Sequence, residues 1–384
     1  MPILSNMART SPRVYNSPAM RKVWRDVLDQ VTPYVAGPPL EEVIRELGLA
    51  SVLRLSANEN PLGPSPRVIE ALRTEAARAH LYPDGGSFAL RKALGVWIGV
   101  EPSWLVAGNG ADELLSFIAR ATLDPGDEVV LPHPAFEPYS TEALLAGATP
   151  LASPLRGYDT DLDDMKRRVT ARTKLVFVCT PHNPASTLVP RGALRRFIES
   201  LGSDAPLVVL DEAYRDFCDH PETPDGTALA REFPHVISLR TFSKIAGLAG
   251  LRVGYAIARP EAIERLNRVR APYNVNRLAQ VAGVAALEDR AHLERTRTLV
   301  LAERPRLTEA LRRRGATVPD SQSNFLLVKV GEQADAYRQA LMKSGILVRD
   351  GALVGFPRHL RITIGDAAGN ARILEVWDRV VGSL

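Results

Sequence analysis

One lysine stands among residues that suit a covalent aldehyde site. Lys244 directly follows Thr241-Phe242-Ser243, and Arg252 comes eight residues after it, at the end of a glycine-containing stretch. A lysine amine forms an imine with an aldehyde, while hydroxyl groups and a forked guanidinium can hold a phosphate. These residue types at this spacing therefore predict a site for an aldehyde that carries a phosphate, a description that fits pyridoxal phosphate.

An acidic residue that could face a pyridine nitrogen stands at Asp211. It ends the apolar run 207–210, which is typical of a fully buried parallel strand, and ligands of open α/β sheets lie at the carboxyl ends of such strands. A buried carboxylate needs a partner, and a protonated pyridine is a suitable one. Tyr214, three residues on, could reach the ring hydroxyl. The alternative interpretation makes Asp211 an N-cap of the next helix.

A glycine-rich turn could supply the phosphate site. The segment Gly108-Asn109-Gly110 precedes a helical pattern that begins near Leu114, so the backbone N–H groups of Ala111 and Asp112 could meet a phosphate at the helix N-terminus. Alone, such a turn is weak evidence, and a simple tight turn is the alternative. Three side chains would complete the site: Thr241, Ser243 and Arg252.

Several segments, in their order and spacing, resemble the fold-type I pyridoxal-phosphate-dependent aminotransferases, and within that family the histidinol-phosphate aminotransferases most closely. The resemblance begins at Thr32-Pro33-Tyr34-Val35 and covers nearly the whole chain after a short leader. It implies an α/β fold with a mainly parallel seven-stranded sheet between helices and a smaller α+β domain. The remaining matching segments are 58–64, 82–84, 108–113, 211–214, 241–244 and 360–365.

The resemblance also implies the cofactor contacts. Lys244 would carry pyridoxal phosphate as a Schiff base, Asp211 would pair with the pyridine nitrogen, and Asn183 and Tyr214 would contact the ring hydroxyl. Phe136 would stack on the ring, although an ordinary core phenylalanine is the alternative. The catalytic set is then Lys244, Asp211 and Tyr214, and the phosphate set is Ala111, Asp112, Thr241, Ser243 and Arg252.

Tyr82 would reach the cofactor phosphate of the neighbouring subunit, which implies a homodimer with shared active sites. In the same way the resemblance places Arg361 where the anionic end of the substrate docks, helped by Tyr34, Arg349 and Asn183. A guanidinium holds a carboxylate or a phosphate equally well, so Arg361 alone does not decide which anion binds. An arm tyrosine and a solvated surface arginine are the alternatives for Tyr34 and Arg349.

One segment departs from the family pattern Asn-Pro-Asn-Asn-Pro-Thr-Gly. Here residues 180–186 read Thr-Pro-His-Asn-Pro-Ala-Ser. The Asn183-Pro184 pair is kept, and its peptide bond could be cis because only X-Pro bonds adopt that form cheaply. Ser186 replaces a glycine, so either it is strained at positive φ or the turn has another shape. His182 is an acid/base candidate or, as we favour, a neutral loop histidine.

Composition is that of an ordinary soluble enzyme. The chain has 384 residues, 45% of them hydrophobic, and its length favours two domains. A net charge of +4, with the basic residues dispersed, does not suggest nucleic acid binding. No segment is apolar enough to span a membrane, the histidines lack metal-ligand spacing, and a disulfide scaffold is unexpected with two cysteines. We therefore expect a cytoplasmic protein, and interpret its basic first 25 residues as an arm or leader.

Strand and helix patterns alternate through the middle of the chain, which predicts a mainly parallel sheet covered on both faces. After residue 272 a long helical stretch, 278–311, precedes short strands, as in a smaller α+β domain. The predicted division is a leader and arm at 1–55 that packs with the small domain, a large cofactor-binding domain at 56–272 and a small domain at 273–384. Predicted strands are 127–131, 174–178, 207–211, 235–240, 251–257, 325–330 and 360–364, with a helix at 191–201.

Three functions remain open. The first is amino transfer from histidinol phosphate or a related amine, plausibly to 2-oxoglutarate, with an aromatic amino acid as the rival donor. The second is decarboxylation of a phosphorylated amino acid on the same scaffold, since sequence does not determine which Cα bond stands perpendicular to the ring. The third, a binding module without catalysis, is disfavoured because every expected cofactor group is present.

Overall fold

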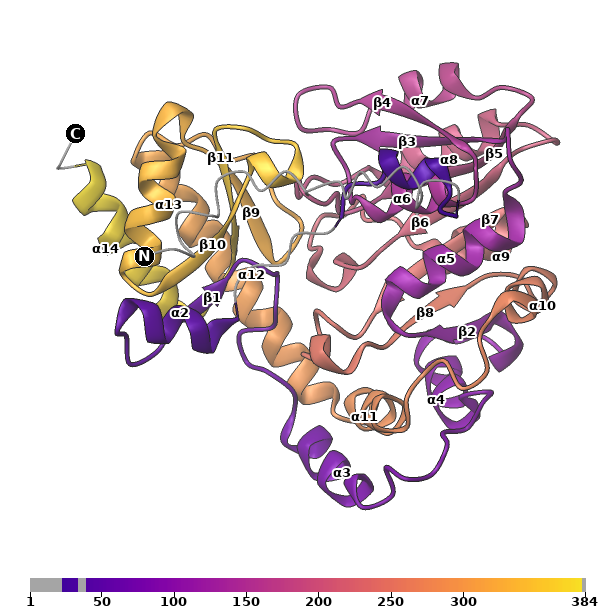
Figure 1. Ribbon diagram of the computed structural model, residues 1–384, viewed down its shortest axis with the longest axis horizontal. Helices are drawn as coiled ribbons and strands as arrows, with labels where there is room; N and C mark the ends of the chain where they lie inside the picture. Colours follow the sequence, from indigo (N-terminus) through magenta and orange to yellow (C-terminus); the bar gives the residue numbers. More distant parts are fainter. Residues whose placement is uncertain (1–22, 34–38, 382–384) are drawn as a thin grey trace.

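The computed structural model describes residues 23–33 and 39–381, which form two sheets with their own helices. A seven-stranded sheet lies on the right of Figure 1 and a four-stranded sheet on the left. The predicted α/β class with a mainly parallel seven-stranded sheet is confirmed. The boundaries at residues 55/56 and 272/273 stay a prediction. Tyr34 falls outside the described residues.

The seven strands are largely parallel because helices connect most of them. Only β8 runs against both of its neighbours. Nearly all residues of the central strands are buried, as expected of a sheet covered on both faces. In spatial order the strands are β2 (Leu105–Gly108), β8 (Gly254–Ile257), β7 (Val236–Thr241), β6 (Leu207–Asp211), β5 (Thr173–Cys179), β3 (Glu128–His133) and β4 (Thr149–Pro154).

Three groups of helices cover this sheet. The first packs leucines, isoleucines and aromatics against one face: α5 (Gly110–Thr122), α6 (Pro138–Leu145) and α10 (Pro260–Val269). The second covers the other face: α7 (Leu162–Arg168), α8 (Arg191–Ser200) and α9 (Gly226–Glu232). The third packs beside β2 and β8: α3 (Pro66–Ala76), α4 (Phe88–Ile98) and α11 (Arg277–Glu288).

The smaller sheet draws strands from both ends of the chain. Its order is β1 (Leu53–Leu55), β10 (Ile346–Asp350), β11 (His359–Thr363) and β9 (Phe325–Lys329). Its core also takes side chains from α12 (Arg290–Arg313), α13 (Ala334–Lys343) and α14 (Ala367–Val381). The remaining elements are α2 (Leu40–Leu47) and the short 3-10 helices η1 (Asp26–Gln30), η2 (Pro102–Trp104), η3 (Arg215–Phe217), η4 (Ala249–Leu251), η5 (Gly331–Gln333) and η6 (Ala352–Val354).

Capping residues explain where two of the helices begin and correct one prediction. Ser65 caps α3 by accepting the Val68 N–H at 3.2 Å, with proline next in the chain. Asp289 ends α11 and accepts the His292 N–H at 3.1 Å as the cap of α12. The expected single helical stretch at 278–311 is therefore two helices, because an aspartate side chain bonds backbone groups more readily at a cap than inside a helix.

The predicted strands are present within one to three residues of their expected limits. The largest error lies at 251–253, where Arg252 has φ +55°, outside strand geometry, and β8 begins only at Gly254. Two unpredicted strands, β2 and β4, lie at the edges of the large sheet. β4 contains Pro150 and Pro154, which obscure a strand pattern but are tolerated at an edge.

Candidate active site

Lys244 lies in the loop that follows β7, with its amine near the small sheet. Its Nζ donates to the Ala57 carbonyl at 3.2 Å and lies 5.7 Å from the centroid of the Tyr214 ring. Burial and, to a smaller extent, the charge of Arg361 lower the pKa of Lys244 to about 8. This amine can therefore exchange protons close to neutral pH.

Asp211 ends β6 and is buried. One carboxylate oxygen accepts a hydrogen bond from the Tyr139 hydroxyl at 2.6 Å, and the other accepts the Ala213 N–H at 3.0 Å. Burial raises the pKa of Asp211 above its usual range despite these bonds. The next element is η3 and not an α-helix, so the alternative of Asp211 as an α-helix N-cap is wrong.

Tyr139 was not found from the sequence. It stands on α6, is fully buried, and stacks on Phe177 of β5 with ring centroids 4.7 Å apart. Phe136 meets its edge at 5.7 Å. The packing of α6 on β5 brings this hydroxyl to Asp211, which lies 72 positions away in the chain. No sequence motif links two residues at that separation.

The N-terminus of α5 and the residues after β7 form a small cradle. The Thr241 hydroxyl and the Ser243 hydroxyl are hydrogen-bonded at 3.0 Å, and Arg252 pairs with Asp112 at 3.0 Å. A Cβ atom at Gly254 would meet the Ala111 nitrogen at 2.8 Å, so a glycine is needed there for β8 to pack against the start of α5. Free amides, hydroxyls and a guanidinium suit an anion of the size of phosphate.

A cavity of about 610 Å³ lies between the two sheets and is lined by Lys244 and Tyr214, whereas Asp211 and the cradle residues are not among its described lining residues. The charges of Arg252 and Asp112 both act on the pKa of Lys244, so the cradle lies close to the lysine. Asn183 accepts a hydrogen bond from Arg361 at 2.9 Å, and the Tyr214 hydroxyl accepts one from Asn58 at 3.0 Å. Of the predicted site residues, six line the cavity: Phe136, Asn183, Tyr214, Lys244, Arg349 and Arg361.

Three arginines share the cavity face of the small sheet. Arg349 of β10 stands directly opposite Arg361 of β11 in antiparallel register. Arg54 of β1 stands opposite Leu347, which shares a face with Arg349 because strand side chains alternate. All three line the cavity, and the Arg54 guanidinium forms an ion pair with Glu59 at 3.3 Å. Arg349 is half-buried, so the interpretation as a solvated surface arginine is wrong.

Comparison of the chain with known proteins identifies its family. The model of the aminotransferase class I and II family matches residues 50–376. This chain belongs to the class I and II aminotransferases. Histidinol-phosphate aminotransferase of Anaeromyxobacter sp. (strain Fw109-5) is 44% identical over 92% of the chain and 97% of its own length. The enzyme of the same name from Symbiobacterium thermophilum is 42% identical over 93% of the chain and 98% of its own length.

Solved structures agree with this aminotransferase assignment. The structure of histidinol-phosphate aminotransferase from Sinorhizobium meliloti in complex with pyridoxal-5'-phosphate is 27% identical to the chain. It superimposes with a TM-score of 0.85 and covers 96% of this chain and 100% of its own. The chain is therefore a pyridoxal-phosphate-dependent aminotransferase with the fold-type I architecture.

The residues of this aminotransferase fit pyridoxal phosphate. Asp211 is a buried carboxylate whose pKa is raised for want of a cation, and a protonated pyridine nitrogen supplies one. The cradle at the start of α5 offers backbone N–H groups and two hydroxyls for a phosphate, and Lys244 lines the cavity. These three features, from separate segments, match the three functional groups of the cofactor.

The altered segment 180–186 is folded back on itself and fully buried at His182 and Ser186. Burial lowers the pKa of His182 to about 4, and its Nδ1 accepts the Ala185 N–H at 3.2 Å. The favoured interpretation, a neutral hydrogen-bonded loop histidine, is confirmed. Ser186 has φ +67°, so serine occupies a conformation that favours glycine and is strained there. The Asn183-Pro184 peptide is cis.

Tyr82 does not reach the cavity of its own subunit. Its side chain is 79% exposed and stacks on Tyr273 with ring centroids 4.8 Å apart.

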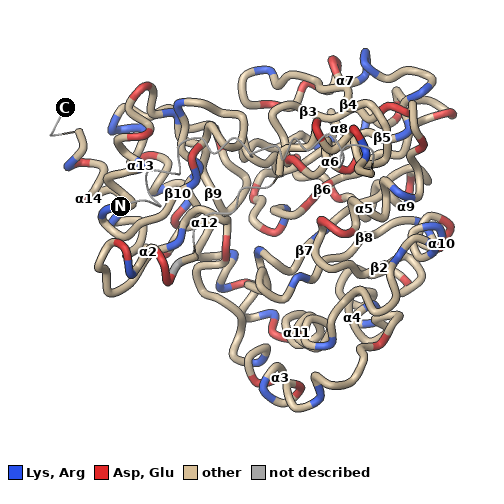
Figure 2. Tube along the Cα trace, in the orientation of Figure 1, with Lys and Arg blue, Asp and Glu red and all other residues tan. Residues whose placement is uncertain are grey.

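Basic and acidic residues are interspersed along both parts of the described chain (Figure 2). Within residues 23–33 and 39–381, no helix combines the length and apolarity needed to cross a membrane. Both cysteines, Cys179 and Cys218, are buried free thiols.

Proposed function

We propose that the enzyme transfers the amino group of histidinol phosphate to 2-oxoglutarate. The relatives at 44% and 42% identity bear the name of that activity. The observation that carries the proposal is the pair Arg349 and Arg361, which face each other across two strands on the wall of the cavity. Like charges placed directly opposite on a sheet destabilise it, and a doubly charged phosphate bound between them would offset that repulsion.

A phosphate monoester suits this wall better than a carboxylate. Arg361 already donates to Asn183 and to the Ser56 carbonyl, so its orientation is held before substrate arrives. Arg349 has no carboxylate partner within the described ranges, which leaves its donors for the substrate. A single carboxylate could match one guanidinium in a bidentate pair, whereas a phosphate has enough oxygens for two. Tyr34 is proposed as a further phosphate contact.

Each of the remaining residues has a part in holding the reacting groups. When bound, pyridoxal phosphate supplies an aldehyde that exchanges amines and a ring that accepts electrons. Asp211 would hold the proton of the pyridine nitrogen, with the Tyr139 hydroxyl fixing the orientation of its carboxylate. Asn183 and Tyr214 would contact the ring hydroxyl, and Phe136 would cover one ring face. Ala111, Asp112, Thr241, Ser243 and Arg252 would hold the phosphate.

Lys244 would move the proton of the substrate. A lysine can accept a proton from the substrate Cα only when it is neutral, and a pKa of about 8 gives a substantial neutral fraction at mildly alkaline pH. The side chain is half-buried on the wall of the cavity, so a bound substrate would keep competing water from the amine. The same side chain could then deliver the proton to a neighbouring atom, and water would release the donor as its carbonyl product while the amino nitrogen stays with the cofactor.

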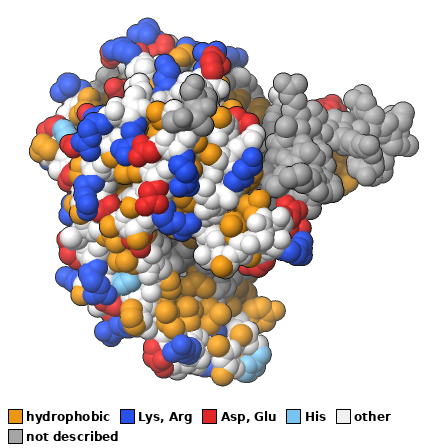
Figure 3. Space-filling view, turned by 90° about the vertical axis from the view of Figure 1, so that its left-hand side faces the viewer, with side chains coloured by type: hydrophobic (Ala, Val, Ile, Leu, Met, Phe, Trp, Pro, Cys, Tyr) orange, Lys and Arg blue, Asp and Glu red, His pale blue; other side chains and the backbone are white. Residues whose placement is uncertain are grey.

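A homodimer with shared active sites belongs to the proposal. Figure 3 shows hydrophobic side chains gathered on the lower part of the molecule, at the level of α3 and α11 in Figure 1. Exposed apolar residues of this region include Leu62, Ile69, Leu81 and Phe88, close in sequence to Tyr82. Such a patch is typical of a subunit interface, and Tyr82 would cross it to the partner's phosphate cradle.

We also place the enzyme in the cytoplasm, where its two free thiols would stay reduced.

An amino-donor panel tests the proposed function. The purified enzyme with pyridoxal phosphate is mixed separately with histidinol phosphate, histidinol, phenylalanine, tyrosine and histidine, and conversion of the cofactor to its amine form is followed by absorbance. We expect histidinol phosphate to have the highest kcat/KM and histidinol to be much poorer. A preference for phenylalanine or tyrosine would contradict the proposal, and release of carbon dioxide without a carbonyl product would indicate a decarboxylase.

A further inference from the structure

A second cavity lies behind the loop that carries Lys244. Its volume is about 510 Å³, and it shares no lining residue with the active-site cavity. The chain alternates between the two: Lys244 lines the first, whereas its neighbours Phe242 and Ile245 line the second. Tyr255 of β8 and Leu293 of α12 extend the apolar wall. A ligand placed here would therefore contact the back of the cofactor loop.

One carboxylate in this cavity has no partner. Asp216 is half-buried, lines the cavity, and neither accepts a hydrogen bond nor forms an ion pair through its carboxylate within residues 23–33 and 39–381. Burial raises the pKa of Asp216, against the lowering effects of Arg215, Arg240 and Arg297. A partly desolvated carboxylate of this kind is stabilised by a cationic hydrogen-bond donor.

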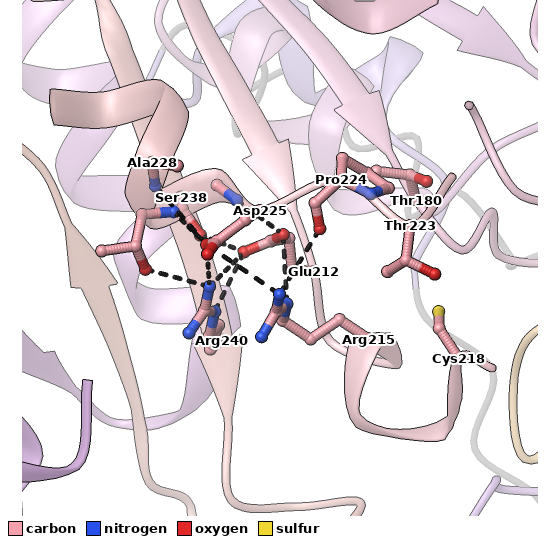
Figure 4. A network of polar contacts seen from close by, with 12 residues as sticks. Thr180, Glu212, Arg215, Cys218, Thr223, Pro224, Asp225, Ala228, Ser238 and Arg240 are labelled. Atoms are coloured by element: carbon pink, nitrogen blue, oxygen red, sulfur yellow. Dashed lines mark hydrogen bonds and ion pairs between the residues drawn. The ribbon is translucent and has the colours of Figure 1, made fainter. Parts of the chain in front are cut away.

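Two guanidinium groups border the same cavity without a carboxylate of their own in the described part of the chain. Arg297 donates to the backbone carbonyls of Asp216 at 3.1 Å and Cys218 at 2.9 Å. Arg290 lies 5.0 Å from the ring centroid of Trp97. The third lining arginine, Arg215, is already committed, because its guanidinium points toward Glu212 and Asp225 in Figure 4.

The charges of the cavity exclude simple ions as its preferred ligand. A small anion attracted by Arg297 would be repelled by Asp216, and by Glu294 at the rim. A small cation attracted by Asp216 would be repelled by Arg297 and Arg290. A molecule with both charges close together satisfies both sides, and the ammonium and carboxylate of an α-amino acid are joined through one carbon.

We propose that this cavity is a regulatory site for a free α-amino acid with a planar side chain. The ammonium group meets Asp216, the carboxylate meets Arg297 and Arg290, and the side chain packs between Trp97 and Tyr255. Aromatic faces favour a planar ring, and the volume lies in the range of ordinary small-molecule sites. Nothing in the proposed amino transfer uses these residues, so the inference does not depend on the identity of the donor.

The site would act on catalysis through the loop. Thr241 lines the second cavity and also belongs to the phosphate cradle, where its hydroxyl bonds Ser243. A ligand that packs on Phe242 and Ile245 restricts the segment that positions Lys244. By the reciprocity of coupled sites, an amino acid that changes the affinity for pyridoxal phosphate must have its own affinity changed by the same factor.

Calorimetry on the enzyme with bound pyridoxal phosphate tests the proposal, with L-histidine and L-phenylalanine as separate probes. We expect saturable binding of at least one probe at a site that Asp216→Asn and Arg290→Ala each weaken about tenfold or more, a loss of about 1.4 kcal/mol. Arg361→Ala, which disables the anion site of the active-site cavity, should leave this binding within about twofold. The matched control is Arg313→Ala, an exposed arginine near the far end of α12.

A second measurement keeps the test independent of folding effects. Arg290 is exposed, and its replacement leaves the apolar core untouched. Binding should also change tryptophan fluorescence, and Trp97→Phe should remove that signal while calorimetry still detects the ligand. The proposal is overturned if neither probe binds up to about 10 mM, a free energy too small for a specific site. It is equally overturned if binding is lost in Arg361→Ala and kept in Asp216→Asn and Arg290→Ala.

Discussion

At the scale of single residues, the site depends on charges held where water is scarce. Burial lowers the pKa of Lys244 and raises that of Asp211, so one group tends toward a neutral amine and the other needs a cation. The shift of Lys244 has the direction that proton transfer requires, whereas burial favours the neutral form of Asp211 until a cation lies beside it. The two arginines of the cavity wall, Arg349 and Arg361, are proposed to bind the anionic end of the substrate.

Arg349→Gln should raise KM for histidinol phosphate by roughly tenfold to a hundredfold, because a hydrogen bond to a charged group is worth about 1.5–3 kcal/mol. The affinity for pyridoxal phosphate should be unchanged, since Arg349 is remote from the phosphate cradle. Steady-state kinetics together with cofactor titration check this. Arg358→Gln, an exposed arginine paired with Glu332, is the control. Equal effects of the two changes would remove Arg349 from the substrate site.

His182 should make the folded state sensitive to mild acid. Its folded pKa is about 4 and its ordinary value is 6.5, so between these pH values the unfolded chain binds a proton that the folded chain does not. The contribution of His182 to the free energy of unfolding should therefore be level above pH 6.5 and fall by on the order of 3 kcal/mol down to pH 4, at 1.36 kcal/mol per pKa unit.

The measurement is urea unfolding at a series of pH values. His182→Gln should flatten the decline between pH 6.5 and 4, because glutamine takes up no proton. His220→Gln, at an exposed position, should leave the decline as it is in the parent enzyme. An unchanged slope in His182→Gln would mean that other groups cause the acid sensitivity.

At the scale of elements, one buried network joins the ends of β6 and β7 to the start of α9 (Figure 4). The Glu212 carboxylate accepts the Gly226 N–H at 3.0 Å and the Ser238 hydroxyl at 2.6 Å, and it pairs with Arg240 at 2.9 Å. Glu212 follows Asp211 directly, and Arg240 precedes Thr241. The network therefore holds the two strand ends from which the cofactor residues project.

Glu212→Gln should lower the free energy of unfolding by about 3–5 kcal/mol, because it leaves the buried Arg240 guanidinium without its main counter-charge. Chemical denaturation measures the loss. The matched change Glu222→Gln removes a carboxylate whose partner, Arg191, is exposed, and should cost less than about 1 kcal/mol. A similar loss in both variants would mean that the buried pair of Glu212 and Arg240 contributes no more to the free energy of unfolding than the exposed pair.

At the scale of the whole molecule, one subunit lacks part of its proposed site. Tyr82 is exposed, does not line the cavity of its own subunit, and stacks its ring on Tyr273. If the proposed dimer forms, the tyrosine of each subunit completes the phosphate cradle of the other. The apolar surface beside it would be buried in the same step.

Subunit mixing tests this arrangement. Tyr82→Ala and Lys244→Ala should each be nearly inactive as separate proteins, but their mixture should recover up to about a quarter of the parent activity, since half of the dimers pair the two variants and each contains one intact site. Activity after exchange of subunits is the measurement. The control is a mixture of Lys244→Ala with Asp211→Ala. Both residues serve the cavity of their own subunit, so every mixed dimer has a defect in each site and no activity should return.

The sequence by itself determined the cofactor and the positions of several strands along the chain. Lys244, Asp211 and the turn before α5 could be predicted because each lies at the end of a local pattern: an apolar strand, or glycines before a helix. The parallel strands followed from their uninterrupted apolar runs, which only burial on both faces explains. Edge strands such as β4 were missed because their patterns are weaker.

Only the tertiary structure decided which groups meet across the sheets. The Tyr139 hydroxyl meets Asp211 from 72 positions away, and Arg349 stands opposite Arg361, 12 positions away. Arg54 joins these two arginines from about 300 positions away. No local sequence pattern indicates such contacts. The state of His182 was likewise decided by its surroundings, since a histidine is neutral or charged according to how far it is removed from water. Local propensity sets the elements, whereas long-range packing sets their neighbours and so the electrostatics of the site.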